Sequence, residues 1–206
     1  MKKMLLGVAV CLALSGNSVQ AASSTNGSTG LINTPSADVV RQGQFYVGYY
    51  NLNEGDSITV GASLAKNLEV SMADINYNEA DKKTYLNAKY AIMQEGVLLP
   101  GIAVGVEDIT DKDDRTAYVA VSKALPFGIR LHAGYGNGRY DGVFYGLEKQ
   151  IIPSLVGGVF PDTSLIIEHD GHDMNYGLRM SLVSGLKINA GWRDKETYVG
   201  VTYNFY

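Results

Sequence analysis

The stretch that decides the fold is YVGVTYNFY, residues 198–206. Every second position carries an apolar or aromatic side chain: Val199, Val201, Tyr203 and Phe205. The alternate positions carry polar or small residues: Tyr198, Gly200, Thr202 and Asn204. This period of two predicts a β-strand with one apolar face. At a chain end such a strand would promote aggregation of a soluble protein, whereas in an outer-membrane barrel it closes the cylinder and turns its apolar face to lipid.

Four residues of this strand resemble the assembly signal at the end of bacterial outer-membrane barrels: Tyr198, Gly200, Tyr203 and Phe205. The pattern is polar or Tyr, any residue, Gly, two residues, aromatic, any residue, aromatic. Tyr206 departs from it by standing one residue beyond the usual terminal aromatic. The resemblance implies two partners, outer-membrane lipid and the barrel-assembly machinery.

Residues 1–21 have the pattern of a cleaved signal peptide. Lys2 and Lys3 precede an apolar run at residues 4–14, and Val19 and Ala21 occupy the small-residue positions of a cleavage site. The run is too short for a transmembrane helix. We therefore expect secretion across the inner membrane and a mature chain that starts at residue 22; a retained N-terminal anchor is the alternative.

The composition excludes several classes of site. Cys11 is the one cysteine and leaves with the signal, so the mature chain has no disulfide, thiol nucleophile or thiolate metal site. Loss of two lysines leaves 15 basic against 21 acidic residues, a net charge near −6. Nucleic-acid binding needs a basic face and is not expected. The 14 tyrosines and 24 glycines fit a barrel with aromatic girdles and a crowded interior.

Alternating segments predict an all-β, antiparallel transmembrane barrel in residues 44–206. Each segment approaches the ~9–11 residues that a tilted strand needs to cross a membrane. Residues 22–43 precede it as an N-terminal segment at or inside the periplasmic mouth, the alternative being a disordered leader. About twelve strands are expected: 44–52, 57–64, 67–76, 83–92, 100–108, 115–123, 129–137, 142–150, 163–170, 174–182, 186–193 and 197–205.

The connections sort into two groups if the N-terminus lies in the periplasm. Every connection predicted outside carries acid: 53–56, 77–82, 108–114, 136–142, 170–173 and 193–196. The turns predicted inside are mostly apolar or small: 65–67, 93–100, 124–128, 151–162 and 183–185. A soluble sandwich would not require this segregation.

The strand face opposite the apolar one mixes glycines with charge. Its ionisable residues are Glu69, Lys89, Glu107, Arg130, His132, Glu148, Glu168, Arg179 and Lys187. Balanced charge predicts an ion-pair network that fills a lumen, because buried charges must be paired or wet. A narrow polar pore is the functional alternative, since a barrel of this size lies between filled small barrels and open porins.

Three stretches together resemble the YjbH-type outer-membrane barrels, a family linked to exopolysaccharide production. They are GLINTPSA at residues 30–37, EHDG at 168–171 followed by NYGLR at 175–179, and residues 186–192 before the last strand. The chain resembles a short, single-barrel member. The resemblance implies polysaccharide or export proteins as partners and supplies no catalytic residues.

The sequence predicts no catalytic residue, no cofactor and no metal site. The cluster at residues 168–173 contains metal-ligand types, but an acidic hairpin loop with Gly171 at its turn explains it as well. The acids at 108–114 lack the calcium-loop spacing, although weak Ca²⁺ binding stays open. No Gly-x-Ser-x-Gly occurs, and His132 fits a packed polar residue better than a general base.

These observations predict an outer-membrane barrel with a structural or transport role at the cell envelope, with an exopolysaccharide role implied by the resemblance. A small diffusion or oligosaccharide-specific porin is one alternative. A soluble periplasmic barrel that binds an apolar ligand is another. The two membrane readings turn the apolar strand face to lipid, whereas the soluble reading turns it inward.

Overall fold

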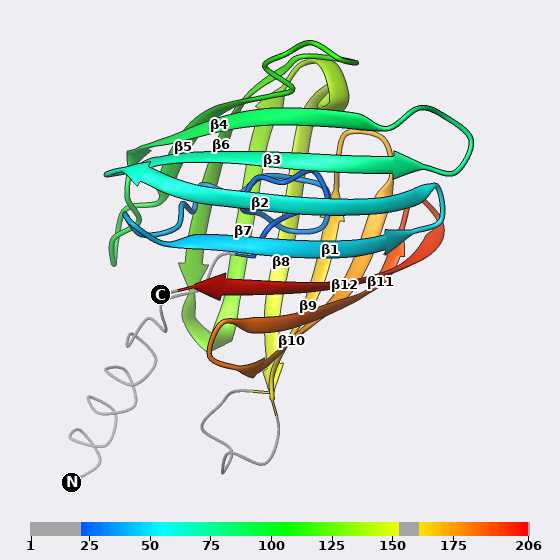
Figure 1. The fold of residues 1–206 in the computed structure, drawn as a ribbon. Helices are drawn as coiled ribbons and strands as arrows, with labels where there is room; N and C mark the ends of the chain where they lie inside the picture. The colour runs from blue at the N-terminus through cyan, green and yellow to red at the C-terminus, as the bar shows by residue number, and fades with distance from the viewer. Residues whose placement is uncertain (1–21, 153–160, 206) are drawn as a thin grey trace, which may run out of the picture.

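The computed structural model describes residues 22–152 and 161–205. The predicted signal peptide, part of the predicted turn at 151–162 and Tyr206 lie outside these ranges. The described residues form one closed antiparallel barrel in which sequential strands pair and β12 pairs with β1 (Figure 1). The strands are β1 (Phe45–Leu52), β2 (Gly55–Ala65), β3 (Leu68–Tyr77), β4 (Lys83–Met93), β5 (Gly101–Glu107), β6 (Thr116–Leu125), β7 (Ile129–Gly136), β8 (Gly142–Ile152), β9 (Asp162–His169), β10 (Met174–Val183), β11 (Leu186–Arg193) and β12 (Glu196–Phe205).

The predicted strands are confirmed, and no boundary differs by more than two residues. Short 3₁₀ turns, η1 (Pro126–Gly128) and η2 (Gly138–Tyr140), interrupt two connections. Among the described residues, no helix has the length and apolar character needed to cross a membrane.

The seam between β12 and β1 runs from the pair Phe205–Phe45 to the pair Val199–Asn51. The rings of Phe45 and Phe205 stack with centroids 4.2 Å apart. Along β12, burial alternates as the sequence predicts, with Tyr198 inside and Val199 outside. The last strand therefore closes the cylinder.

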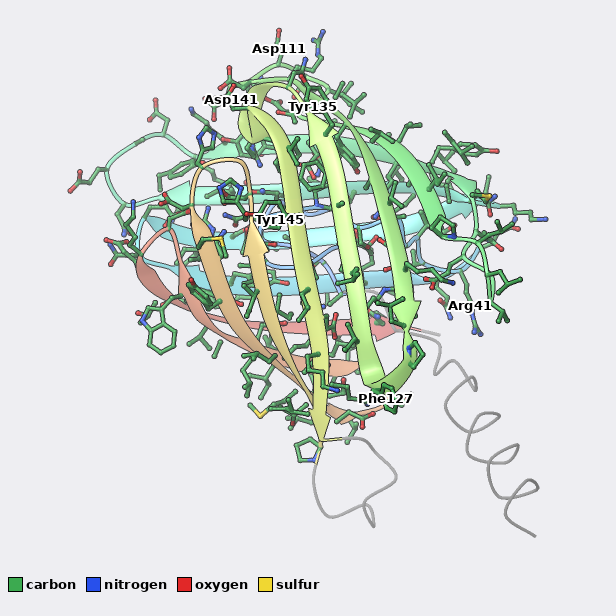
Figure 2. The ribbon with its side chains drawn as sticks, turned by 180° about the vertical axis from the view of Figure 1, so that it is seen from behind. Arg41, Asp111, Phe127, Tyr135, Asp141 and Tyr145 are labelled. Carbon is green, nitrogen blue, oxygen red and sulfur yellow. The ribbon has the colours of Figure 1, made fainter. Side chains whose placement is uncertain are left out.

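The outer face of the barrel is an exposed apolar belt with aromatic residues near both ends. One aromatic band lies toward the acidic connections: Tyr49, Tyr135, Tyr145, Tyr176 and Trp192. The other lies at the opposite end: Phe45, Tyr90, Phe127, Tyr203 and Phe205. Figure 2 shows Tyr135 near Asp141 and Phe127 at the far end. An apolar belt between aromatic girdles is the surface of an outer-membrane barrel, so the soluble alternative with an apolar interior is wrong.

Glycines on the inner face make room for aromatic rings from the neighbouring strand. Gly61 pairs with Tyr46, and a Cβ on Gly61 would lie 2.2 Å from the Tyr46 ring. Three further directly paired positions repeat this arrangement: Gly105 with Tyr118, Gly134 with Phe144, and Gly200 with Tyr50. The rings lie flat against the inner wall because the facing residue has no side chain.

Residues 22–37 lie inside the barrel, and each of them is buried. The chain folds back on itself within the lumen through isolated bridges between Ser23 and Thr29 and between Gly30 and Pro35 (Figure 1). The sequence predicted a segment at or inside the periplasmic mouth. The structure places it deeper in the lumen, because its polar backbone finds partners on β3 and β4 and on β9 and β10. We call residues 22–40 the plug segment.

Candidate functional site

The GLINTPSA stretch forms a tight loop at the centre of the plug segment. The Leu31 amide donates to the Thr34 carbonyl at 2.9 Å. Gly30 is required at the start of the loop, because a Cβ there would lie 2.1 Å from the Thr34 carbonyl oxygen. This turn leaves the amides of Ile32, Asn33 and Thr34 without partners inside the loop. Consecutive amides that converge in this way form a site for an anion.

The anion is the carboxylate of Glu168 on β9. The Asn33 amide donates to Glu168 Oε1 at 2.7 Å, and the Ile32 amide donates to Oε2 at 3.0 Å. Thr34 adds its amide at 3.3 Å and its hydroxyl at 2.8 Å, both to Oε2. Asn175 of β10 donates to Oε1 at 3.1 Å. Glu168 has no exposed surface, and these donors replace the water that an ionised carboxylate needs.

Other residues of the EHDG and NYGLR stretches hold the same loop. Arg179 Nη2 donates to the carbonyls of Leu31 at 2.9 Å and Gly30 at 3.2 Å. Asn33 donates its side-chain amide to Asp170 at 2.8 Å. Two of the stretches that carry the resemblance to YjbH-type barrels are therefore the two halves of one contact, between the plug segment and the wall formed by β9 and β10.

The opposite wall, formed by β3 and β4, binds the plug segment with the same chemistry. Glu69 accepts from the Thr29 amide at 2.8 Å and from the Val40 amide at 3.3 Å. Lys89 donates to the carbonyls of Thr29 at 2.8 Å and Ser36 at 3.3 Å. Glu69 and Lys89 also face each other across the strands, with Nζ and Oε1 3.5 Å apart.

A third contact lies in the half of the lumen opposite the acidic connections. Arg130 forms ion pairs with Asp38 of the plug segment at 2.5 Å and with Glu95 at 2.8 Å. The Ala37 amide donates to the Ser122 hydroxyl, which lies 2.8 Å from His132 Nδ1. His132 thus lies in the wall beneath the plug segment.

The remaining predicted lumen residues have other partners. Glu107 accepts from the Tyr140 hydroxyl at 2.8 Å and faces Arg139 at 3.9 Å. Glu148 pairs with Arg179 at 3.7 Å. Lys187 is buried on β11, opposite Thr202. Of the predicted charges, the structure thus brings together Glu69 with Lys89 and Glu148 with Arg179.

A cavity of about 730 Å³ lies above the plug segment, at the end with the acidic connections. We call it the vestibule. Asn26 and Asn33 of the plug segment contribute to its lining. All six acidic connections or their adjoining strand ends supply the rest: Glu54, Ile75, Tyr77, Tyr85, Asp113, Asp114, Gly138, Arg139, Tyr140, Asp141, Asp170, His172, Asp173, Arg193 and Asp194.

The carboxyls of the vestibule differ in their pKa. Burial opposes ionisation of Asp170, but hydrogen bonds from Asn33, Asn175 and two backbone amides outweigh it and lower the pKa of Asp170. Burial likewise opposes ionisation of Asp113, and its bonds with Lys83 and Tyr85 hold its pKa below the ordinary value. Burial, together with neighbouring carboxylates, raises the pKa of Asp194 against the effect of Arg193.

The histidines of the 168–173 cluster point to different partners. The His169 ring stacks on Tyr145 of β8 with centroids 5.2 Å apart. His172 Nε2 lies 3.1 Å from the Arg139 carbonyl oxygen. Among the residues that the structure describes, no three His, Cys, Asp or Glu side chains are grouped so as to hold a metal ion. The cluster is a hairpin loop with Gly171 at φ 103°.

Sequence reasoning named Glu168 and Arg179 as lumen residues but did not predict what they bind. It counted lumen charges as partners of one another, whereas Glu168 and Arg179 bind backbone groups of residues 30–34. The sequence did carry one signal: the stretches at residues 30–37 and 168–179 are rich in polar residues, yet their spacing matches no catalytic site. Asp38 and Glu95 carried no signal, because they lie outside the alternating strand pattern. Arg193 ends a predicted strand on the same face as Lys187, so the alternation could have identified it.

A protein-family model matches the N-terminal part of the chain. The model of the family described as exopolysaccharide biosynthesis protein YbjH matches residues 22–152, more than half of the chain, including the plug segment and β1–β8. The chain belongs to the YjbH family. The expectation drawn from the three sequence stretches is thereby confirmed. Among curated proteins, none matches the chain.

Solved structures share the barrel fold of this YjbH-family chain. It is similar to a KdgM porin, with a TM-score of 0.56 and 13% identity over 79% of this chain and 99% of that one. The same values hold for a KdgM porin in complex with disordered oligogalacturonate. At this identity the likeness shows the fold alone. The Glu168 and Arg179 contacts are properties of the present chain.

Proposed function

We propose that the chain resides in the bacterial outer membrane and supports exopolysaccharide production or export as a barrel closed at rest by its own plug segment. The observation that carries this proposal is the complete burial of residues 22–37 within the lumen. The segment is held on two walls by carboxylates bound to its amides and by cations bound to its carbonyls. No catalytic step is part of this role.

Family membership supports the exopolysaccharide role, and the outward apolar belt supports the outer-membrane location. The short outer connections leave little surface for a large adhesive partner. The protein contributes a membrane cylinder, a closed lumen and a vestibule. In this account, polysaccharide or export proteins meet the barrel at its two ends.

A porin that passes oligosaccharides is the second candidate, and the fold of the KdgM porin favours it. In this chain, passage would require the plug segment to move. The bound oligogalacturonate of the KdgM structure is a polyanion, whereas the vestibule here presents seven carboxylates. Like charge opposes entry of that class of glycan. A porin function would therefore concern a neutral or cationic saccharide.

The role is tested in a strain that lacks this protein, by measuring surface polysaccharide with and without the wild-type chain. We expect a loss that the chain restores. Normal polysaccharide in the deficient strain would contradict the proposal.

A cross-link separates a structural role from a transport role. A Cβ built on Gly101 lies 3.5 Å from Ala37 Cβ, within the range of a disulfide. The double variant Ala37→Cys/Gly101→Cys should therefore attach the plug segment to β5, and the rest of the mature chain has no cysteine. If the locked form restores polysaccharide as well as each single variant does, the barrel acts without opening. If only the reduced form restores it, the plug segment must move.

A further inference from the structure

We infer that the vestibule is a binding site for a saccharide that carries amino groups. The inference rests on the proposed function, and it names the class of glycan that the outer end of the barrel would take. The cavity volume of about 730 Å³ lies in the range of ligand pockets, and its walls come from all six outer connections. It is thus a built cavity rather than a gap between two loops.

The plug segment forms the floor of the vestibule through Asn26 and Asn33. Asn33 of the plug segment accepts from Thr25 and Arg193 and donates to Asp170, so its side chain is fixed by the groups beneath and beside it. Asn87 of β4 holds the Asn26 carbonyl at 2.8 Å. A ligand that enters from outside therefore meets a polar floor whose side chains are already held in place.

Charge selects a cationic ligand. Seven carboxylates line the vestibule against two arginines, and the lysines that reach them are Lys83 and Lys195. Three negative charges remain in excess. Among the described residues, the exposed carboxylates Asp114 and Asp141 form no ion pair, so they are available to an ammonium group. Carboxylates that share a recess with a low-dielectric wall raise the local concentration of cations.

One aromatic ring gives the site a preference for a sugar over a simple ion. Tyr77, Tyr85 and Tyr140 line the same cavity, but Tyr85 and Tyr140 are buried, and Tyr77 is the half-exposed ring of the three. Arg139 covers the Tyr85 ring at 5.1 Å, whereas Lys83 lies 5.9 Å from the centre of the Tyr77 ring. The Tyr77 ring is thus the one that an incoming ligand can reach, and it already attracts a cation of the protein itself. An amino sugar offers an apolar ring face to Tyr77 and an ammonium group to carboxylate, which a metal ion does not.

The test is calorimetric titration of the detergent-purified chain with a glucosamine tetramer, its fully N-acetylated counterpart and a galacturonic acid tetramer. We expect the amine form to bind at least about tenfold more tightly than the acetylated form, the factor that corresponds to roughly 1.4 kcal/mol. The galacturonic acid form should not bind. Salt should weaken the amine form, because exposed charges are screened.

Matched variants locate the site. Asp114→Asn/Asp141→Asn should weaken binding of the glucosamine tetramer about fivefold or more, on the scale expected for two partly exposed charge pairs. Glu79→Gln/Asp81→Asn removes two acids of an outer connection that do not line the vestibule, and it should leave binding unchanged. Heat-dependent gel mobility confirms that each variant is a folded barrel.

Three outcomes would overturn the inference: no binding of the amine tetramer, equal binding of both tetramers, or equal effects of the two double variants. Calcium binding that depends on Asp114 and Asp141, without binding of the amine tetramer, would also overturn it. These results are independent of the polysaccharide phenotype. A deficient strain with normal polysaccharide removes the proposed function but leaves the measured affinities standing.

Discussion

Two opposite walls hold the plug segment with the same chemistry but with different electrostatics. On the β3–β4 wall, Glu69 and Lys89 bind the segment and also pair with each other, 3.5 Å apart. On the β9–β10 wall, Glu168 accepts hydrogen bonds from uncharged donors of the segment and from Asn175, while Arg179 donates to two carbonyls. The first wall carries a buried ion pair, and the second carries a carboxylate in an amide nest.

This difference shows two ways to keep a polar segment inside a barrel. A buried ion pair is costly to break, because removal of one partner leaves the other charged and unsolvated. A carboxylate in an amide nest depends on the shape of the loop that it binds. The β3–β4 wall should therefore be sensitive to charge, and the β9–β10 wall should be sensitive to the conformation of residues 30–34.

The largest effect is expected from Glu69→Ala. The substitution leaves the Lys89 ammonium buried without its partner and removes the acceptor of the Thr29 and Val40 amides. Loss of one partner of a buried pair costs about 3–5 kcal/mol. We expect the free energy of plug release, measured by hydrogen exchange of residues 22–40, to fall by that amount. The double variant Glu69→Gln/Lys89→Met should recover most of it, and a double variant as unstable as Glu69→Ala would contradict the ion-pair account.

Glu168→Ala should give the next largest effect. It leaves the amides of Ile32, Asn33 and Thr34 without an acceptor. Unlike Glu69, Glu168 has no lysine or arginine as an ion-pair partner among the described residues, so no buried cation loses its partner. Unpaired buried donors cost about 1–3 kcal/mol, more when the lost acceptor is charged. Exchange should increase at residues 30–34 before it increases at residue 29. Uniform loss of protection over the whole plug segment would mean that the two walls act as one unit.

Glycine substitutions sharpen the comparison at a smaller scale. Gly61→Ala would place a Cβ 2.2 Å from the Tyr46 ring. The hydroxyl of Tyr46 donates to the Gly27 carbonyl and to Glu69. We expect about 1–3 kcal/mol of destabilisation from this overpacking, measured by the temperature of the heat-dependent gel shift. Gly177→Ala meets the movable ends of Tyr198 and Ile32 and should cost less.

Gly96→Ala is the matched control, because nothing lies within 4 Å of a Cβ at that position. An equal loss for Gly61→Ala and Gly96→Ala would show that crowding against Tyr46 is not the cause.

Acid should loosen the β9–β10 wall through Asp170, with the smallest effect. Because the folded-state pKa of Asp170 is lowered, its contribution is fully present above the ordinary Asp pKa of about 3.9. It is lost as the pH falls below that value through the folded pKa. Protonation weakens the bond to Asn33, so exchange at Asn33 should rise as the pH falls below about 3.9. Asp170→Asn should abolish this dependence, and an unchanged dependence would assign it to another group.

The barrel could be predicted from the sequence because its determinants are local. Alternation along each strand places Val199 outside and Tyr198 inside, and turn residues separate one strand from the next. Both features need only neighbouring residues. The aromatic girdles and the acidic connections follow from the same alternation once the direction of the first strand is assumed.

The partners of the lumen residues could not be predicted in the same way. Glu168 and Ile32 are 136 positions apart, and their contact depends on a turn in the plug segment that has no periodicity. Charge counting paired Glu168 with a lysine or arginine, because a sequence does not show backbone amides as competitors. The resemblance pointed to both stretches but could not show that they bind each other.

The central claim is that the plug segment closes the lumen and that Glu69 and Glu168 keep it there. Single-channel recording in planar bilayers tests it most directly, with wild type, Glu69→Ala/Glu168→Ala, and that variant combined with the Ala37–Gly101 cross-link. The account predicts no steady current for wild type, an open current for the double variant, and loss of that current on oxidation of the cross-link. A steady wild-type current that the cross-link leaves unchanged would contradict it.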